Sequence, residues 1–196
     1  MRFPEILFRL PEWVEGILPD PDHTFPTVTD RMRFVITLSR LNIEHATGGP
    51  FGAGIFDMNT NRLLAPGINI VTQSNCSVAH AEIMAIMIAQ NMIGHYDLGY
   101  EGLRSFELVT STEPCAMCLG AVCWSGIRLL VCGAREVDAR NIGFDEGPKI
   151  SNWTHSLKDR GIIVLQDICR YEASAVLNQY LKSGGIIYNS RQGNVK

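Results

Sequence analysis

The sequence predicts an α/β fold, in which a mixed sheet of five strands is covered by helices on both faces. Two apolar stretches separated by a turn come first, and helical and strand-like segments then alternate to the end of the chain. Such alternation is typical of a sheet with helices packed on each side. The chain has 196 residues, of which 46% are hydrophobic, and this suits one domain with a sizeable core.

Residues 1–28 are predicted to form an arm with little regular structure, because five prolines fall within it. Residues 29–196 follow as a single predicted domain. Its first helix is expected to begin at Thr29 and Asp30, which can cap it, and apolar residues at helical spacing continue it to about His45.

The other elements follow from apolar patterns and from the turn residues between them. Strands are expected at 53–58 and 63–71, the second of them broken by Pro66 and Gly67. Four helices and three strands then alternate: a helix at 79–92, a strand at 106–110, a helix at 115–125, a strand at 127–132, a short helix at 136–141, a strand at 162–165 and a helix at 170–182.

Composition limits the classes of partner. The net charge is −3, with 17 basic and 20 acidic residues, and no two basic residues are adjacent. A protein that grips phosphates usually carries a basic face, so we expect a small neutral substrate and no nucleic acid. No stretch has the length and apolarity of a membrane span, and no signal-peptide pattern precedes the domain, so we expect a cytoplasmic protein with no membrane partner.

Two short motifs carry the chemistry. Residues 80–82 are His-Ala-Glu, and residues 113–118 are Glu-Pro-Cys-Ala-Met-Cys. Together they supply one imidazole, two thiols and at least one free carboxylate. A zinc ion with three protein ligands keeps one position open for water, which is the catalytic arrangement rather than the structural one.

The spacing within each motif is informative. Cys115 and Cys118 are three residues apart at a predicted helix start, so their sulfurs share one side, and the helix N-terminus favours thiolates. His80 and Glu82 would point apart on a regular helix. They can share a site only if His80 precedes the regular helix, and Glu82 would then stay unligated and move protons. Taken singly, either motif could be a polar helix start or half of a structural zinc site.

Between about residues 48 and 148 the chain resembles the cytidine-deaminase superfamily, whose mark is H-x-E followed by P-C-x-x-C. Within it, the chain most resembles the bacterial guanine deaminases. The shared segments are Gly-Gly-Pro-Phe-Gly-Ala from residue 48, Asn-Ile-Val-Thr from residue 69, the two zinc motifs, and Gly-Phe-Asp-Glu from residue 143. The resemblance implies a three-layer αβα fold. It also implies zinc held by His80, Cys115 and Cys118, with Glu82 as proton shuttle.

The resemblance further implies hydrolytic deamination of guanine to xanthine and ammonia. Asn69 and Ala81 would contact the purine, Trp124 would line the pocket, and Glu146 would contact the amino-bearing edge and assist catalysis. On sequence alone, Asn69 could be a turn residue, Trp124 a core residue and Glu146 part of a solvated loop. The family usually has aspartate in place of Glu146, so a longer side chain could also admit amino-triazines such as ammeline.

In this family the C-terminal part covers the active site, often exchanged within a dimer, so we expect a homodimer. Residues after about 150 are expected to cover the site, with Trp153, Tyr171 and Tyr188 as candidates. The zinc motifs alone would also fit a tRNA adenosine deaminase or a cytosine deaminase. A different class of protein, a non-catalytic scaffold held together by zinc, would not depend on Glu82.

Overall fold

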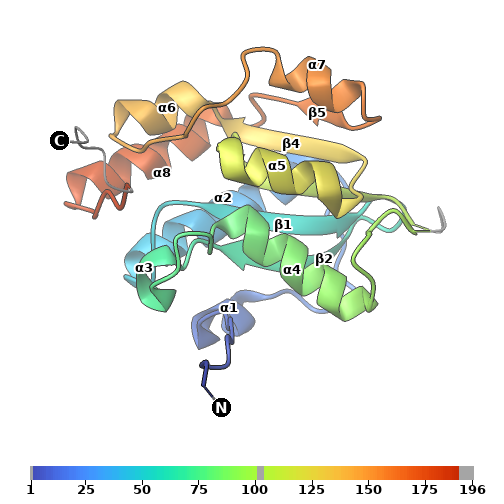
Figure 1. Ribbon diagram of the computed structural model, residues 1–196, viewed down its shortest axis with the longest axis horizontal. Coiled ribbons are helices and arrows are strands. Elements are labelled where there is room, and N and C mark those ends of the chain that lie inside the picture. Colours follow the sequence, from blue (N-terminus) through green and yellow to red (C-terminus); the bar gives the residue numbers. More distant parts are fainter. Residues whose placement is uncertain (1, 101–103, 190–196) are drawn as a thin grey trace.

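The computed structural model describes residues 2–100 and 104–189, so residues 190–196 of the predicted domain lie outside it. It confirms a mixed five-stranded sheet between two layers of helices (Figure 1). The strand order is β2-β1-β3-β4-β5. Strand β1 is antiparallel to both β2 and β3, while β3, β4 and β5 are parallel. The strands are β1 (Gly52–Asp57), β2 (Arg62–Ile68), β3 (Phe106–Thr112), β4 (Leu129–Ala134) and β5 (Ile163–Leu165).

The helices cover both faces of this sheet and enclose two apolar cores. One face carries α4 (Ala81–Ile93), α5 (Ala116–Ser125) and α7 (Trp153–Lys158). The other face carries α2 (Val28–Glu44) and α8 (Arg170–Lys182), with α6 (Glu136–Asn141) beside α8. Strands β1 and β3 are buried along their whole length, as strands covered on both faces should be. In the described part of the chain, no helix is long and apolar enough to cross a membrane.

The arm contains a helix that the sequence pattern did not predict, α1 (Glu12–Ile17). Pro11 directly precedes it, and proline is well tolerated at a helix start. Val14 is buried against Leu38 and Ile68, so α1 adds a third, smaller core under α2 and β2. The prolines therefore limit the helix to one and a half turns but do not prevent it.

Other local predictions also differ from the structure. Helix α2 is capped by Thr27 rather than Thr29: the Asp30 backbone N–H donates to Thr27 Oγ1 over 3.1 Å, and the Asp30 carboxylate accepts from the Thr27 N–H. Strand β2 is not broken at Pro66 and Gly67. It is an edge strand, where proline loses no ladder bond on its free side.

Gly67 brings β2 unusually close to α4. A Cβ atom at this position would lie 2.1 Å from the carbonyl oxygen of Ala81 and 2.7 Å from the backbone nitrogen of Ala85. The missing side chain therefore lets the first turn of α4 rest directly on the backbone of the strand. The predicted strand also ends earlier than expected, because α3 (Val71–Ser74) replaces its last residue.

Candidate metal centre and active site

The proposed zinc ligands lie at the N-termini of two neighbouring helices. His80 is the N-cap of α4 with extended backbone angles, φ −76° and ψ 158°. This confirms that His80 precedes the regular helix, which is what allows Glu82 to share its site. Cys115 is the N-cap of α5, also extended, and Cys118 follows within the first turn.

The three ligand atoms fit a zinc ion. The Nδ1 atom of His80 lies 3.6 Å from the Sγ atom of Cys115 and 3.6 Å from that of Cys118. Tetrahedral zinc, about 2.0–2.1 Å from nitrogen and about 2.3 Å from sulfur, requires N···S separations of about 3.6 Å. Cys115 is also prepared for metal binding. A hydrogen bond with Cys118, and then one with His80, lower the pKa of its thiol to about 4, although burial opposes this.

Glu82 lies beside the three ligands and lines the same cavity. Its side chain is buried, on the second residue of α4. Burial, and then the negative charge of Cys115, raise the pKa of this carboxyl to about 7. A carboxyl group with such a pKa can both accept and donate a proton at neutral pH.

The cavity has a volume of about 350 Å³, which is within the usual range for small-ligand sites. Phe51 and Phe144 meet edge to face in its wall, with ring centroids 5.0 Å apart. Asn69 is a buried residue of the same lining, and its Oδ1 accepts from the Val71 backbone N–H over 3.3 Å, which orients the amide group. Glu146 is also buried, and burial, followed by the charges of Cys115 and Glu82, raises its pKa to about 8.

Sequence reasoning left open which C-terminal residues cover the cavity, and the structure places Tyr188 and Asn189 there. The Oη atom of Tyr188 is buried and has no hydrogen-bond partner within the described residues. Gly49 makes room for it, since a Cβ there would lie 2.1 Å from this Oη. Asn189 donates to the Gly143 carbonyl and accepts from the Asp145 N–H, which fastens the C-terminal segment to the Glu146 loop.

The other two candidates lie elsewhere. Tyr171 is 89% exposed on α8, and Trp153 packs in the core beneath α7. No local motif distinguishes Tyr188 from them in the sequence, because its role depends on a chain reversal after α8.

Two residues expected to contact the substrate do not line this cavity within one chain. Trp124 is 81% exposed on the outer side of α5. It comes six residues after Cys118, a rotation of about 240° around a helix, so the two side chains face different directions. Ala81 is completely buried at the first position of α4, against β2.

Three residues that would hold zinc, next to a buried carboxyl that would stay outside the ligand set, fit the site of a zinc hydrolase. Comparison with known proteins identifies the family. Residues 28–134, more than half of the chain, match the cytidine and deoxycytidylate deaminase zinc-binding region. The chain belongs to this family and is a zinc-dependent hydrolase of carbon–nitrogen bonds.

Individual relatives agree with this assignment. The guanine deaminase of Bacillus subtilis is 38% identical over 115 residues, which cover 59% of this chain and 69% of that protein. The solved structure of guanine deaminase from Nitrosomonas europaea is 43% identical, covers 91% of this chain and 97% of its own, and superposes with a TM-score of 0.86. A solved structure of a substituted protein in complex with 8-azaguanine is 43% identical over 91% of this chain and 97% of that chain, with a TM-score of 0.87.

Proposed function

We propose that this protein deaminates guanine to xanthine and ammonia. One observation carries the proposal: a single cavity brings His80, Cys115 and Glu82 together with Asn69 and Glu146. The relatives named guanine deaminase, and the structural neighbour that binds a guanine analogue, support the same substrate. Zinc, when bound, supplies a lowered pKa for the attacking water.

Recognition of the base is assigned to the walls of the cavity. Neutral guanine presents N–H donors along the edge that bears its amino group, and a carboxylate accepts them with charge-assisted strength. Glu146 has this role in our proposal. Asn69 would hydrogen-bond another edge through its oriented amide, and Phe51 and Phe144 would exclude water from the ring faces.

Proton transfer is assigned to Glu82. It accepts a proton from the attacking water and delivers it to a ring nitrogen, which makes the amino-bearing carbon electrophilic. A carbon–oxygen bond then forms at that carbon. In the second half of the reaction Glu82 takes the proton of the newly bound hydroxyl group and, assisted by Glu146, passes it to the amino group. The carbon–nitrogen bond then breaks, the carbonyl of xanthine forms and ammonia leaves. A buried carboxyl with a pKa near 7 suits this alternation.

The direct test is ammonia release by the purified zinc protein with guanine, ammeline, cytosine and adenine. We expect turnover of guanine that does not depend on added nucleic acid. Ammeline is a secondary candidate, because the long Glu146 side chain could also meet a triazine edge. Activity on adenine in tRNA, with none on free guanine, would refute the proposal. The matched variant Glu146→Gln should raise the KM for guanine while keeping zinc.

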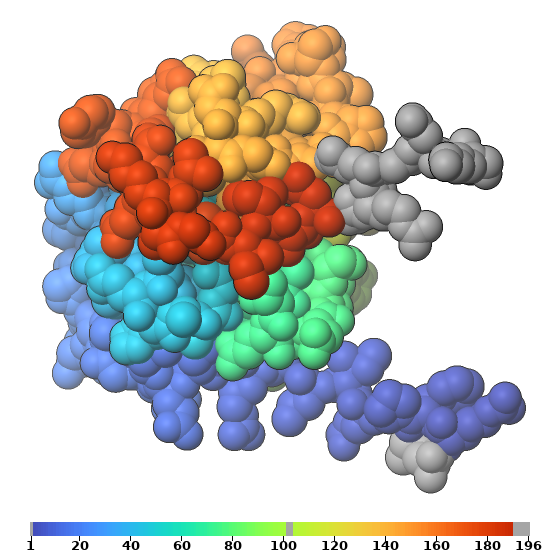
Figure 2. Space-filling model, turned by 90° about the vertical axis from the view of Figure 1, so that its left-hand side faces the viewer, coloured from blue at the N-terminus to red at the C-terminus, as the bar shows by residue number. Residues whose placement is uncertain are grey.

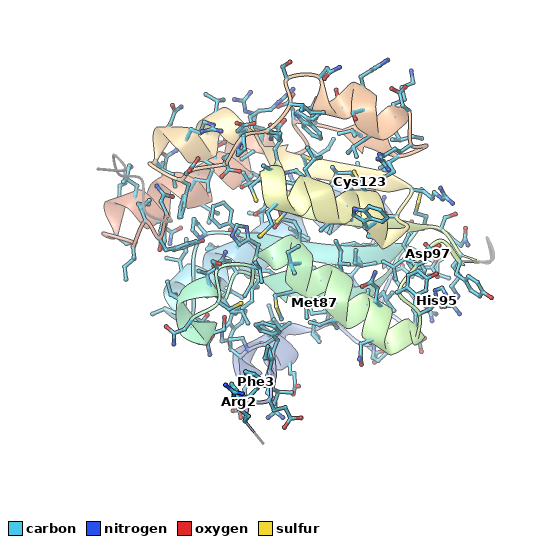
Figure 3. All side chains as sticks on the ribbon, viewed as in Figure 1. Arg2, Phe3, Met87, His95, Asp97 and Cys123 are labelled. Carbon is cyan, nitrogen blue, oxygen red and sulfur yellow. The ribbon has the colours of Figure 1, made fainter. Side chains whose placement is uncertain are left out.

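The proposal includes a second copy of this chain as partner. Helices α4 and α5 form an outward surface without charge, since α5 has no charged residue and the charged residue of α4, Glu82, is buried. Met87, Met117 and Trp124 are nevertheless 40%, 36% and 81% exposed there. Figure 3 marks this surface with Met87 on α4 and Cys123 on α5. Surface helices normally carry charge on their outer side, so this one is expected to be covered.

The arm supports a second copy as the covering partner. Phe3, Ile6 and Leu7 are each about three-quarters exposed, at 73%, 78% and 75%. In Figure 2 the arm extends to the right, past the body of the molecule, on the side that α4 and α5 cover in Figure 1. A two-fold copy seated on α4 and α5 would meet this apolar arm, and two uncharged surfaces would face each other without repulsion.

Light scattering decides this point. The wild-type chain should have the mass of a dimer, and Met87→Glu with Trp124→Asp should shift it to the mass of a monomer. Glu172→Lys, on the opposite helical layer, is the control. A monomeric wild type at micromolar concentration would refute the dimer. We also propose a cytoplasmic location, because none of the six cysteines is joined in a disulfide, and cell fractionation tests it.

A further inference from the structure

Lys149 is a buried cation that neither motif nor resemblance singled out. Its side chain is 2% exposed. The Nζ atom lies 2.7 Å from Glu136 Oε2 and 3.9 Å from Glu113 Oε2, and 4.9 Å from the centre of the Trp153 ring. Burying an ammonium group is costly unless charges and hydrogen bonds compensate it. Packing alone therefore does not explain why a lysine, rather than an apolar residue, is buried at position 149.

The contact between Lys149 and the loop that leads into Cys115 supplies that reason. Lys149 Nζ donates a hydrogen bond of 3.1 Å to the carbonyl oxygen of Pro114, which belongs to the peptide group leading into Cys115. On the other side of Cys115, the Ala116 N–H donates to the carbonyl of Glu146 over 2.9 Å. The peptide groups before and after the metal ligand are thus both held by one short segment, residues 146–149.

The same segment carries the carboxyl assigned to the substrate. Glu146 points into the cavity three residues before Lys149, and the Arg140 guanidinium holds the Gly147 carbonyl from outside over 3.0 Å. Cys115 and Glu146 lie about thirty residues apart in the chain, yet the bonds from Lys149 to Pro114 and from Ala116 to Glu146 connect their segments. A shift of residues 146–149 would therefore also shift Cys115.

We propose that Lys149 is a positioning residue that fixes the orientation of Cys115 relative to Glu146. One buried ammonium group would then control both the affinity for zinc and the placement of the base. The inference rests on the proposed function for the role of Glu146, but its effect on zinc does not depend on the identity of the substrate.

The test uses Lys149→Met, which keeps the length and apolar stem but removes the ammonium group. Zinc affinity, measured by competition with a chelator, should fall about tenfold or more, as is usual when a group that orients a metal ligand is lost. Cobalt-substituted protein should show a shifted thiolate-to-metal absorption band. The value of kcat/KM for guanine at saturating zinc should fall about tenfold. Lys158→Met, an exposed lysine on α7, is the control and should change none of these.

Further variants separate positioning from simple stability. Glu136→Gln removes the ion pairs that Glu136 forms with Lys149 and with Arg140 but leaves the bond from Lys149 to Pro114. If that bond is what positions Cys115, zinc affinity should stay within about twofold of wild type. Lys149→Met should also lower the thermal stability, because it leaves Glu136 without its buried cation. The double variant Lys149→Met with Glu136→Gln should regain part of that stability without regaining zinc affinity. Recovery of both together would overturn the inference, as would wild-type zinc affinity in Lys149→Met. A wild type that binds zinc but leaves guanine intact would refute the proposed function, and the zinc measurements would still decide the role of Lys149.

Discussion

Buried carboxyl groups lie at both ends of β3, and their surroundings differ. Glu107, near the start of the strand, is 1% exposed and forms an ion pair with Arg31 of α2. Glu82 and Glu146, beyond its other end, are almost as buried at 6% and 5%, yet among the described residues neither forms an ion pair. Burial raises the pKa of all three. At the first end the carboxyl belongs to a charge pair. At the second end Glu113 is also paired, with Arg135 and Lys149, whereas Glu82 and Glu146 have no cation at ion-pair distance among the described residues.

The largest effect is expected for the unpaired carboxyls of the second end. Glu82→Gln keeps the size of the side chain but removes the proton relay, so turnover should fall by about 10²–10⁴-fold. Zinc content and folding should remain at wild-type levels, because Glu82 is not a ligand in this assignment. Ammonia release per bound zinc is the measurement. A variant that retains more than about a tenth of wild-type turnover would contradict the assignment.

The paired end should respond in stability instead. Arg31→Met leaves Glu107 buried without its cation, which should lower the free energy of unfolding by about 3 kcal/mol. Arg31→Met with Glu107→Leu should recover most of this loss, since both charges are then gone. Urea unfolding measures the change. Turnover per folded molecule should stay constant in both variants, and a selective loss of turnover would break the contrast between the two ends.

Tyr188 tests the cavity end with a smaller change. Tyr188→Phe keeps the ring, which packs against Phe144 with centroids 5.0 Å apart, but removes the unpartnered hydroxyl. If the hydroxyl bonds the substrate, the KM for guanine should rise about two- to tenfold, the usual worth of one hydrogen bond. The control is Tyr171→Phe, on the exposed side of α8. An unchanged KM would exclude Tyr188 from substrate binding.

The smallest effect concerns acid stability away from the cavity. A hydrogen bond from Arg170 lowers the pKa of Asp138, which also accepts the Arg135 backbone N–H at the start of α6. Because the folded pKa is depressed, this contribution is present above the ordinary value near 3.8 and disappears as the pH falls through the folded pKa. Asp138→Asn removes the charge of a partly exposed ion pair, so it should cost at most about 1 kcal/mol at pH 7 and flatten the unfolding curve below pH 4. An equally steep acid limb in the variant would contradict this.

Local signals in the sequence sufficed for the fold class and for the metal centre. The spacing of His80 and Glu82 required a helix start between them, and the structure confirms it. Cys115 and Cys118 needed only a short helix after a strand, which the pattern also indicated. These inferences succeeded because each depends on residues close together in the chain.

The remaining features depend on contacts between distant segments. Tyr188 reaches the cavity because the chain reverses after α8, and Lys149 reaches Pro114 across a loop. Neither contact leaves a mark in local sequence. The role expected for Trp124 stays a prediction, because family resemblance gives a residue's identity but not the side of the helix on which it lies, and within one chain Trp124 faces away from the cavity. The break expected at Pro66 depended on whether β2 is an edge strand, which only the sheet order reveals.

The bare backbone at Gly67 has a consequence for how the site can vary. Because Gly67 has no Cβ atom, the backbone of β2 can contact the Ala81 carbonyl, and this contact sets the distance between the sheet and the first turn of α4. Even one methyl group would push the start of α4 outward and would move His80 and Glu82 together, away from the two sulfurs on the neighbouring helix. The position of His80 relative to the two sulfurs thus depends on a residue of the sheet that contacts none of the three ligands.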